Sequence, residues 1–132
     1  NKIYNDNNIS KLKLLGKALS NLKIIKESKT AYMYLKRDNL ADSNYEKGDT
    51  EGIVNYGLSL KKIEFSAIFI EDLEKKNLIK ISFRSKNNFP CNKFAKENFD
   101  GGGHINAAGG MYKGKIENAI LKFKEKLKKF KS

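Results

Sequence analysis

The residues best suited to chemistry lie in one segment near the C-terminal end, Gly-Gly-Gly-His-Ile-Asn-Ala-Ala-Gly-Gly at residues 101–110. Consecutive glycines cost backbone entropy and add no packing, so they are expected where the main chain takes unusual angles or approaches a ligand closely. Successive N–H groups in such a turn form a concavity that suits a phosphate. His104 and Asn106 could add hydrogen bonds to a phosphate oxygen or a base. The segment predicts a phosphate-binding loop; the alternative is a flexible connection with His104 on the surface.

Three further positions could take part in binding. Arg84 ends an apolar run, and its planar fork can hold a phosphate through two hydrogen bonds without titrating; the alternative is an exposed charge that closes a strand. Glu51 and Asn55 would share one helix face at a spacing of four residues, although a glutamate in a first turn also serves the helix itself. Phe89, beside Pro90, is the aromatic residue selected for a base contact.

The sequence contains few residues that could bind a metal ion. It has one histidine and one cysteine, lacks an Asp-His-His triplet, and spaces its acids without a metal-ligand pattern. We therefore expect no metal and no catalytic residue here. Cys91 and His104 could form a nucleophilic pair, but a lone cysteine after a proline more often is a small buried residue.

The net charge of +12 favours a polyanionic partner, but the distribution of the charge along the chain weakens this conclusion. Residues 1–36 carry eight lysines and two acids, residues 37–112 carry eleven bases and eleven acids, and residues 113–132 carry eight lysines and two acids. The excess therefore lies in two terminal helices, where solvated helix faces are the simpler explanation.

The remaining pattern predicts the elements that must position these residues. Helical spacing of apolar residues covers 9–25 and 116–130, and a shorter helix is expected over 49–56, ended by Gly57. Strands are expected at 30–35, 64–71, 78–84 and 107–112, the second and third joined as a hairpin, with a short helix at 92–98. The aromatic residues at alternate strand positions are assigned to the core: Tyr32, Tyr34, Phe65 and Phe69. This order predicts an α/β fold, a mixed sheet of about four or five strands flanked by helices.

Four motifs in the same order resemble the C-terminal, DHH-associated domain of DHH-superfamily phosphoesterases. The Gly-Gly-Gly-His segment at 101–104 resembles the family signature. The segment at 12–16 looks like the linker helix, 49–56 is similar to a recurrent segment of the nano-RNase branch, and Ser-Phe-Arg-Ser at 82–85 matches its substrate-contacting strand end. The resemblance divides the chain into residues 1–28, the linker helix from a catalytic DHH domain, and residues 29–132, the substrate-binding domain.

The resemblance implies a division of labour between two domains. A DHH domain outside this chain would hold two Mn²⁺ ions, and this domain would present the substrate. The residues it implies for substrate binding are Arg84, Ser85, Gly101, Gly102, Gly103, His104 and Asn106. The expected activity of the complete protein is hydrolysis of short oligoribonucleotides, with phosphoadenosine phosphate as a second substrate. The partners would then be short RNA or nucleotide phosphates and the DHH domain.

Other functions stay open at this stage. Within the family, the domain could serve a cyclic-dinucleotide phosphodiesterase or a single-strand exonuclease. Outside it, the lysine-rich helices could make a non-catalytic nucleic-acid-binding module, or the apolar stripe of the first helix could dock a protein partner. A homodimer is also left open. No apolar run is long enough to cross a bilayer, and one cysteine without a signal peptide predicts the cytoplasm.

Overall fold

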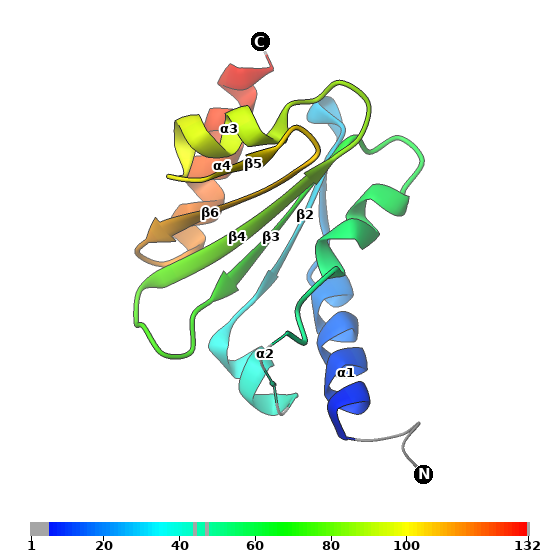
Figure 1. Cartoon of the computed structure of the whole chain (residues 1–132), viewed down its shortest axis with the longest axis vertical. Coiled ribbons are helices and arrows are strands. Elements are labelled where there is room, and N and C mark those ends of the chain that lie inside the picture. Colours follow the sequence, from blue (N-terminus) through cyan, green and yellow to red (C-terminus); the bar gives the residue numbers. More distant parts are fainter. Residues whose placement is uncertain (1–5, 44, 47, 132) are drawn as a thin grey trace.

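The computed structural model describes residues 6–43, 45–46 and 48–131. The chain forms an α/β fold around one six-stranded mixed sheet with the order β1-β2-β3-β4-β6-β5 (Figure 1). The strands are β1 (Lys23–Ile25), β2 (Thr30–Leu35), β3 (Phe65–Glu71), β4 (Leu78–Ser85), β5 (Gly102–His104) and β6 (Ala107–Lys113). Among these described strands, β2 and β3 pair in parallel and the other neighbours pair antiparallel. The predicted fold class is confirmed, and the additional strands are the three-residue edges β1 and β5.

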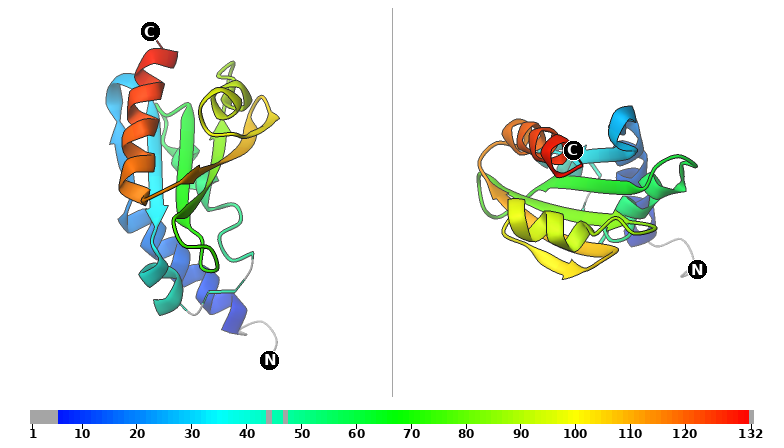
Figure 2. Two further views of the ribbon diagram at one scale, coloured as in Figure 1. Left: turned by 90° about the vertical axis from the view of Figure 1, so that its left-hand side faces the viewer. Right: turned by 90° about the horizontal axis from the view of Figure 1, so that it is seen from above.

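Helices cover the two faces of this sheet unequally. They are α1 (Asp6–Ser20), α2 (Arg37–Asp42), α3 (Cys91–Asn98) and α4 (Ile116–Phe130), with 3₁₀ turns η2 (Lys26–Ser28) and η3 (Ile53–Ser59). α3 and α4 bury one face, and Figure 2 shows α4 running along that side of the strands. α1, α2 and η3 pack on the other face, over β2 and β3. On that second face β4, β6 and β5 carry half-buried or exposed residues.

The larger core forms on the α4 side because large apolar residues recur at every second strand position. Phe65 lies at its centre, with ring centroids 4.3 Å from Phe89, 5.4 Å from Phe94 and 5.8 Å from Phe123. The apolar stripe of the last helix is confirmed, since Phe123 and Leu127 are buried against these rings. The aromatic positions assigned to the core are confirmed as well; Tyr32, Phe65 and Phe69 are buried, and Tyr34 packs against them partly exposed.

Two helix boundaries differ from the prediction. The first helix ends at Ser20, because residues 23–25 turn back and pair antiparallel with β2. Residues 49–56 do not form an α-helix, since Gly52 takes a left-handed φ of 83° and only a 3₁₀ turn follows it. Gly57 does not end this turn but lies within it against Ser66, where an added Cβ would meet the hydroxyl at 2.1 Å.

Asp49 does not cap that segment and instead anchors it to the first helix. Its buried carboxylate accepts hydrogen bonds from the Ser10 hydroxyl at 2.6 Å and from the Glu46 N–H at 2.9 Å. The short helix α2 was not predicted, because Leu40 is its one buried residue and no apolar stripe marks it.

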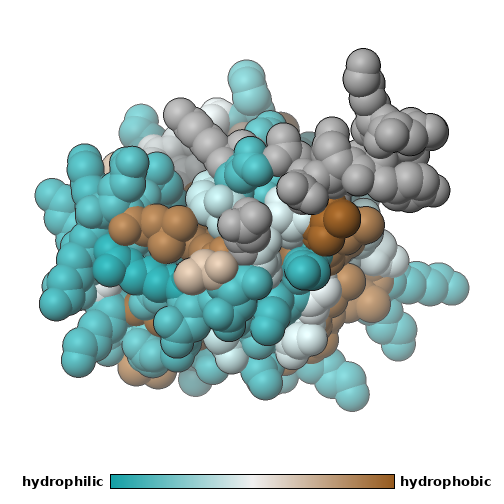
Figure 3. Space-filling model, turned by 90° about the horizontal axis from the view of Figure 1, so that it is seen from below, coloured by the Kyte–Doolittle hydropathy of each residue, from teal (hydrophilic) through white to brown (hydrophobic). Residues whose placement is uncertain are grey.

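Figure 3 shows the molecule from below, where the surface is largely hydrophilic and apolar side chains form small separate patches. The start of α1 and the end of α4 lie at opposite ends of the long axis (Figure 1). Among the described residues, no helix combines the length and apolar character needed to cross a membrane.

Candidate functional site

The Gly-Gly-Gly-His segment lies in an edge strand where a loop was expected. Residues 102–104 form β5, which pairs antiparallel with β6 across a two-residue turn at Ile105 and Asn106. Gly101 enters the strand directly from α3, and its N–H donates to the Ala95 carbonyl at 3.2 Å. The turn is held by the Cys91 N–H, which donates to the Ile105 carbonyl at 2.8 Å. Residues 102–104 therefore pair with β6 on one side, and the other side of β5 is an edge of the sheet.

Strand register brings Arg84 and His104 onto the same face. Ala107 of β6 pairs with Arg84 on one side and with His104 on the other. One row further along, Gly109 pairs with Ser82 and with Gly102. Since adjacent strands are about 4.8 Å apart, Arg84 and His104 lie about 10 Å from each other across the small Ala107. We call this surface the open face, and it comprises Ser82, Arg84, Gly102, His104, Ala107 and Gly109.

The glycines of this region differ in whether packing or backbone conformation requires a glycine at their position. An added Cβ at Gly101 would meet the Gly109 carbonyl oxygen at 1.8 Å, and Gly103 takes a φ of 144° with backbone at 2.6 Å. Packing and conformation therefore require glycine at both positions. Gly102, by contrast, has an unstrained φ and no atom within 4 Å of an added Cβ, and Gly109 would make only one ordinary contact, at 3.5 Å. The two glycines that the fold does not require both line the open face.

Arg84 is half-buried on this face with most of its donors unused by the described residues. Its Nη1 donates to the Phe83 carbonyl at 2.8 Å and lies 3.4 Å from the Ala108 carbonyl. These contacts hold the guanidinium over β4 and β6, and the remaining N–H groups are available to a ligand. The geometry suits a planar, two-bond grip on a phosphate.

Ser85 and Asn106 take structural positions that differ from the expected ligand contacts. Alternation along β4 directs Ser85 to the opposite face from Arg84, where its side chain is buried. Its hydroxyl lies 2.7 Å from the Phe89 carbonyl and 3.1 Å from the Ile105 carbonyl, and it accepts a hydrogen bond from the Asn106 amide at 2.9 Å. Ser85 and Asn106 therefore tie the end of β4 to the β5–β6 turn, and Ser85 has no side-chain surface for a phosphate.

Phe89 is a core residue, which corrects its selection for a base contact. Its ring stacks on Phe65 at 4.3 Å and contacts Phe130 at 5.6 Å, and 7 % of the residue is exposed. The Lys131 ammonium lies over the same ring at 5.2 Å. Because Phe65, Phe130 and Lys131 surround the ring, Phe89 has no free face on which a base could stack.

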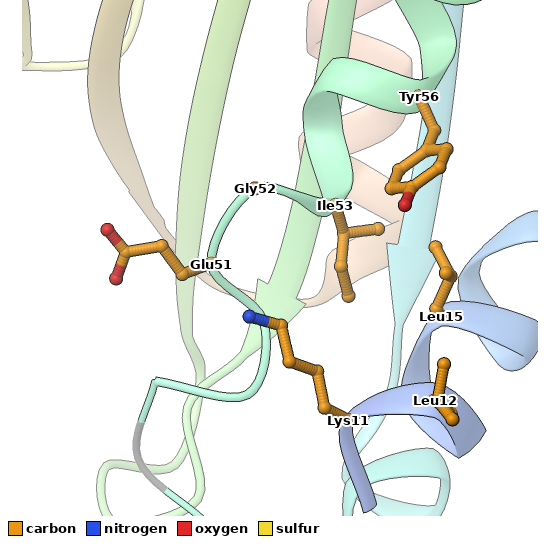
Figure 4. Close-up of a pocket in the computed structure, with 7 residues that line it drawn as sticks. All are labelled: Lys11, Leu12, Leu15, Glu51, Gly52, Ile53 and Tyr56. Atoms are coloured by element: carbon orange, nitrogen blue, oxygen red, sulfur yellow. The ribbon is translucent and has the colours of Figure 1, made fainter. Parts of the chain in front are cut away.

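Glu51 lies in a different hollow from the open face. This hollow has a volume of about 450 Å³ and is lined from α1 and the start of η3 by Lys11, Leu12, Leu15, Glu51, Gly52, Ile53 and Tyr56 (Figure 4). Figure 4 shows the Glu51 carboxylate pointing away from the apolar wall of Leu12, Leu15 and Tyr56. Asn55 is exposed in η3, and because the segment is not α-helical, the expected shared helix face of Glu51 and Asn55 is wrong.

Cys91 is fully buried, as the simpler explanation of a lone cysteine predicted. Burial raises the pKa of its thiol above the usual value, and this outweighs the Ser85 hydrogen bond and the nearby Arg84 charge. The thiolate fraction at a given pH is therefore lowered, which disfavours Cys91 as a nucleophile.

We expect Cys91 to react with a thiol reagent at pH 8 at least about 10-fold more slowly in the folded chain than in denaturant, because reaction requires local opening. Stopped-flow labelling with a chromogenic disulfide measures both rates. Equal rates would contradict the burial of this thiol.

Three contributors to this surface lie within the predicted motifs but were not selected individually as binding residues. Ser82, Gly109 and Ala107 lie on the open face through strand register alone. Ser82 could have been found, because it lies two residues before Arg84 and strand side chains alternate. The described residues contain no group of three or more histidine, cysteine, aspartate or glutamate side chains that could hold a metal ion.

Fold and surface together define an α/β domain that presents a glycine-floored face between an arginine and a histidine. Residues 27–131 match the family model of the DHHA1 domain. This chain belongs to the DHHA1 domain family, whose members accompany DHH catalytic domains of phosphoesterases.

Two solved structures are similar to this chain. An exopolyphosphatase-related protein from Bacteroides fragilis is similar over 92 % of this chain and 35 % of its own, with 45 % identity and a TM-score of 0.87. A pGpG-specific phosphodiesterase from Vibrio cholerae shares the fold over 94 % of this chain and 40 % of its own, with 14 % identity and a TM-score of 0.64. The chain thus spans well under half of either protein. No curated protein matches it.

Proposed function

We propose that this chain is the substrate-binding domain of a DHH-family phosphodiesterase that degrades short oligoribonucleotides to mononucleotides, with phosphoadenosine phosphate as a second substrate. The observation that carries the proposal is the open face, where Arg84 and His104 stand on either side of a floor made of Ala107, Gly109 and Gly102. An arginine fork and an imidazole separated by about 10 Å of flat backbone can hold two polar ends of a nucleotide.

The role of the chain in this reaction is positioning. Arg84 binds a phosphate, His104 donates or accepts at the far side, and the glycine floor admits the sugar or base close to the main chain. Holding the scissile phosphate in one orientation lowers the activation barrier, because the entropy of orienting the substrate is lost on binding and not in the chemical step. The Mn²⁺ ions that activate water would be held by the catalytic DHH domain, which we propose as the partner of this chain in the parent protein, in the cytoplasm.

A cyclic dinucleotide or a long single strand could also reach an open, flat surface. The phosphate grip proposed for Arg84 is common to all these substrates, so length dependence distinguishes them. A non-catalytic nucleic-acid-binding module would instead depend on the terminal helices and respond steeply to salt.

The test is titration of the chain with a labelled RNA dinucleotide and with phosphoadenosine phosphate, for wild type and His104→Ala, at two salt concentrations. We expect saturable binding that His104→Ala weakens about 5- to 10-fold, the effect of removing one hydrogen bond.

Lys128→Ala, at an exposed position of α4, is the control and should bind like wild type. Binding that is indifferent to His104→Ala but lost in high salt or in Lys128→Ala would overturn the proposal in favour of the helix-based module.

A further inference from the structure

A second hollow lies at the end of the sheet where η2 leads into β2, η3 leads into β3, and β4 ends. Its volume is about 740 Å³. Five lysines line it, from three separate segments of the chain: Lys26, Lys29, Lys61, Lys62 and Lys86. The other lining residues are Ile24, Leu60, Ile63, Glu64 and Asn87. This concentration of ammonium groups arises from tertiary folding and is separate from the lysines of the terminal helices.

The charge of this lysine hollow is left uncompensated by its own lining. Glu64 is the one acidic residue among its described lining, and the Glu64 carboxylate is paired at 2.5 Å with Lys131, which follows the end of α4. Lys131 also donates to the Ser28 carbonyl at 2.6 Å, so this pair fastens the wall of the hollow. Like charges brought into one concavity raise the free energy of the folded chain and favour a bound polyanion.

The chemistry of the lining indicates which kind of polyanion fits. Lysine ammonium groups act as point charges with three rotatable donors, and they bind phosphates without fixing a planar geometry. Among the residues that the structure describes, the lining contains no aromatic side chain for base stacking and no arginine. Ile24 and Leu60 are partly exposed and offer apolar contact to sugars or base edges. A chain of phosphates, bound without regard to base sequence, matches this set of groups.

The lysine hollow and the open face lie at the same end of β4. Lys86 follows Arg84 by two residues, about 7 Å along the strand direction. The Lys86 ammonium donates to the Leu58 carbonyl at 3.1 Å, which holds it between η3 and the end of β4. The Asn87 carbonyl lies 3.5 Å from the amide of Asn106 in the turn that follows His104. A strand bound at Arg84 therefore meets Lys86 next and then the other four lysines.

We propose that the lysine hollow binds the additional phosphates of an oligonucleotide whose end is held on the open face, so that affinity rises with strand length beyond two nucleotides. This inference rests on the proposed function for the position of the strand end, whereas the lysine lining of the hollow is independent of that proposal.

The test compares 5′-phosphorylated RNA of two and six nucleotides by fluorescence anisotropy, for wild type and Lys61→Gln/Lys62→Gln. The matched control is Lys75→Gln/Lys76→Gln, another adjacent exposed pair, in the β3–β4 turn at the opposite end of these strands. We expect the hollow variant to bind the hexanucleotide about 10-fold more weakly and its salt slope to fall by about 1.4, as for two lost phosphate contacts to a single strand. Dinucleotide binding should change less than about 2-fold, and the control should match wild type for both lengths.

The remaining outcomes overturn one proposal without the other. Dinucleotide binding that depends on His104, with no loss of hexanucleotide affinity in Lys61→Gln/Lys62→Gln, refutes the lysine hollow and leaves the proposed function. Lysine-dependent hexanucleotide binding with no dinucleotide binding supports the hollow and refutes the open face. Equal losses of hexanucleotide affinity in the hollow and control variants would show a general charge effect and refute the inference. Lysine-dependent binding to phosphatidylserine vesicles without RNA binding would assign the hollow to a membrane surface, which also refutes the inference.

Discussion

Replacing Arg84 by alanine is expected to lower the affinity of the chain for an RNA dinucleotide about 100-fold, as measured by isothermal titration calorimetry. A charge-assisted, two-bond contact with a phosphate contributes about 1.5 to 3 kcal/mol, and this loss lies at the upper part of that range. The guanidinium is held over β4 and β6 through Nη1, so its other donors are oriented before a ligand arrives.

Arg84→Lys separates the geometry of the fork from its charge. Lysine keeps the charge and cannot reproduce two parallel hydrogen bonds, so we expect an intermediate loss of about 10-fold. The midpoint of urea unfolding should change little in either variant, because the Arg84 contacts within the chain are to backbone carbonyls at a half-buried position. Unchanged affinity in Arg84→Ala, or a loss of affinity explained by unfolding, would remove Arg84 from the site.

Alanine at Gly101 is expected to lower stability, whereas alanine at Gly102 is expected to lower dinucleotide affinity without lowering stability. Gly101→Ala places a methyl group 1.8 Å from the Gly109 carbonyl oxygen, and relieving this clash with backbone should cost about 3 kcal/mol of unfolding free energy. Gly102→Ala meets no atom within 4 Å and should leave stability unchanged to within about 0.5 kcal/mol. Its methyl group would nevertheless stand on the floor of the open face and lower dinucleotide affinity about 10-fold.

Urea denaturation and dinucleotide titration of the same two variants check this prediction. Gly102→Ala with unchanged affinity would show that no ligand approaches the main chain of β5. Gly101→Ala with wild-type stability would show that β5 moves away from β6 without cost, which contradicts the packing described for this edge.

The sheet was predictable wherever strand residues alternate over six or more positions. Phe65 and Phe69, and Ile79, Ile81 and Phe83, alternate with residues of the other face, and this alternation predicts the β3–β4 hairpin correctly. The three-residue strands could not be predicted in this way. Ile25 continues the helical spacing of α1, and only its pairing with Thr30 makes it part of a strand.

The position of the candidate site was predicted from the sequence, but the roles of its individual residues were not. Glycines 101–103 look alike in the sequence, and only packing separates those the fold requires from Gly102. Ser85 and Phe89 follow Arg84 closely in the chain, but strand alternation and the aromatic core turn both away from the open face. The lysine hollow escaped prediction because its residues come from segments that are far apart in the sequence and are brought together only by folding.

The two edges of the sheet limit how copies of this chain can associate. β1 and β5 are each three residues long, so each edge exposes only a few unpaired backbone groups. Short edge strands give a neighbouring chain little ladder to extend, which protects a sheet from edge-to-edge pairing and aggregation. At β5 the same shortness keeps the glycine floor accessible to a ligand. Association of two copies by pairing along β1 or β5 is therefore disfavoured.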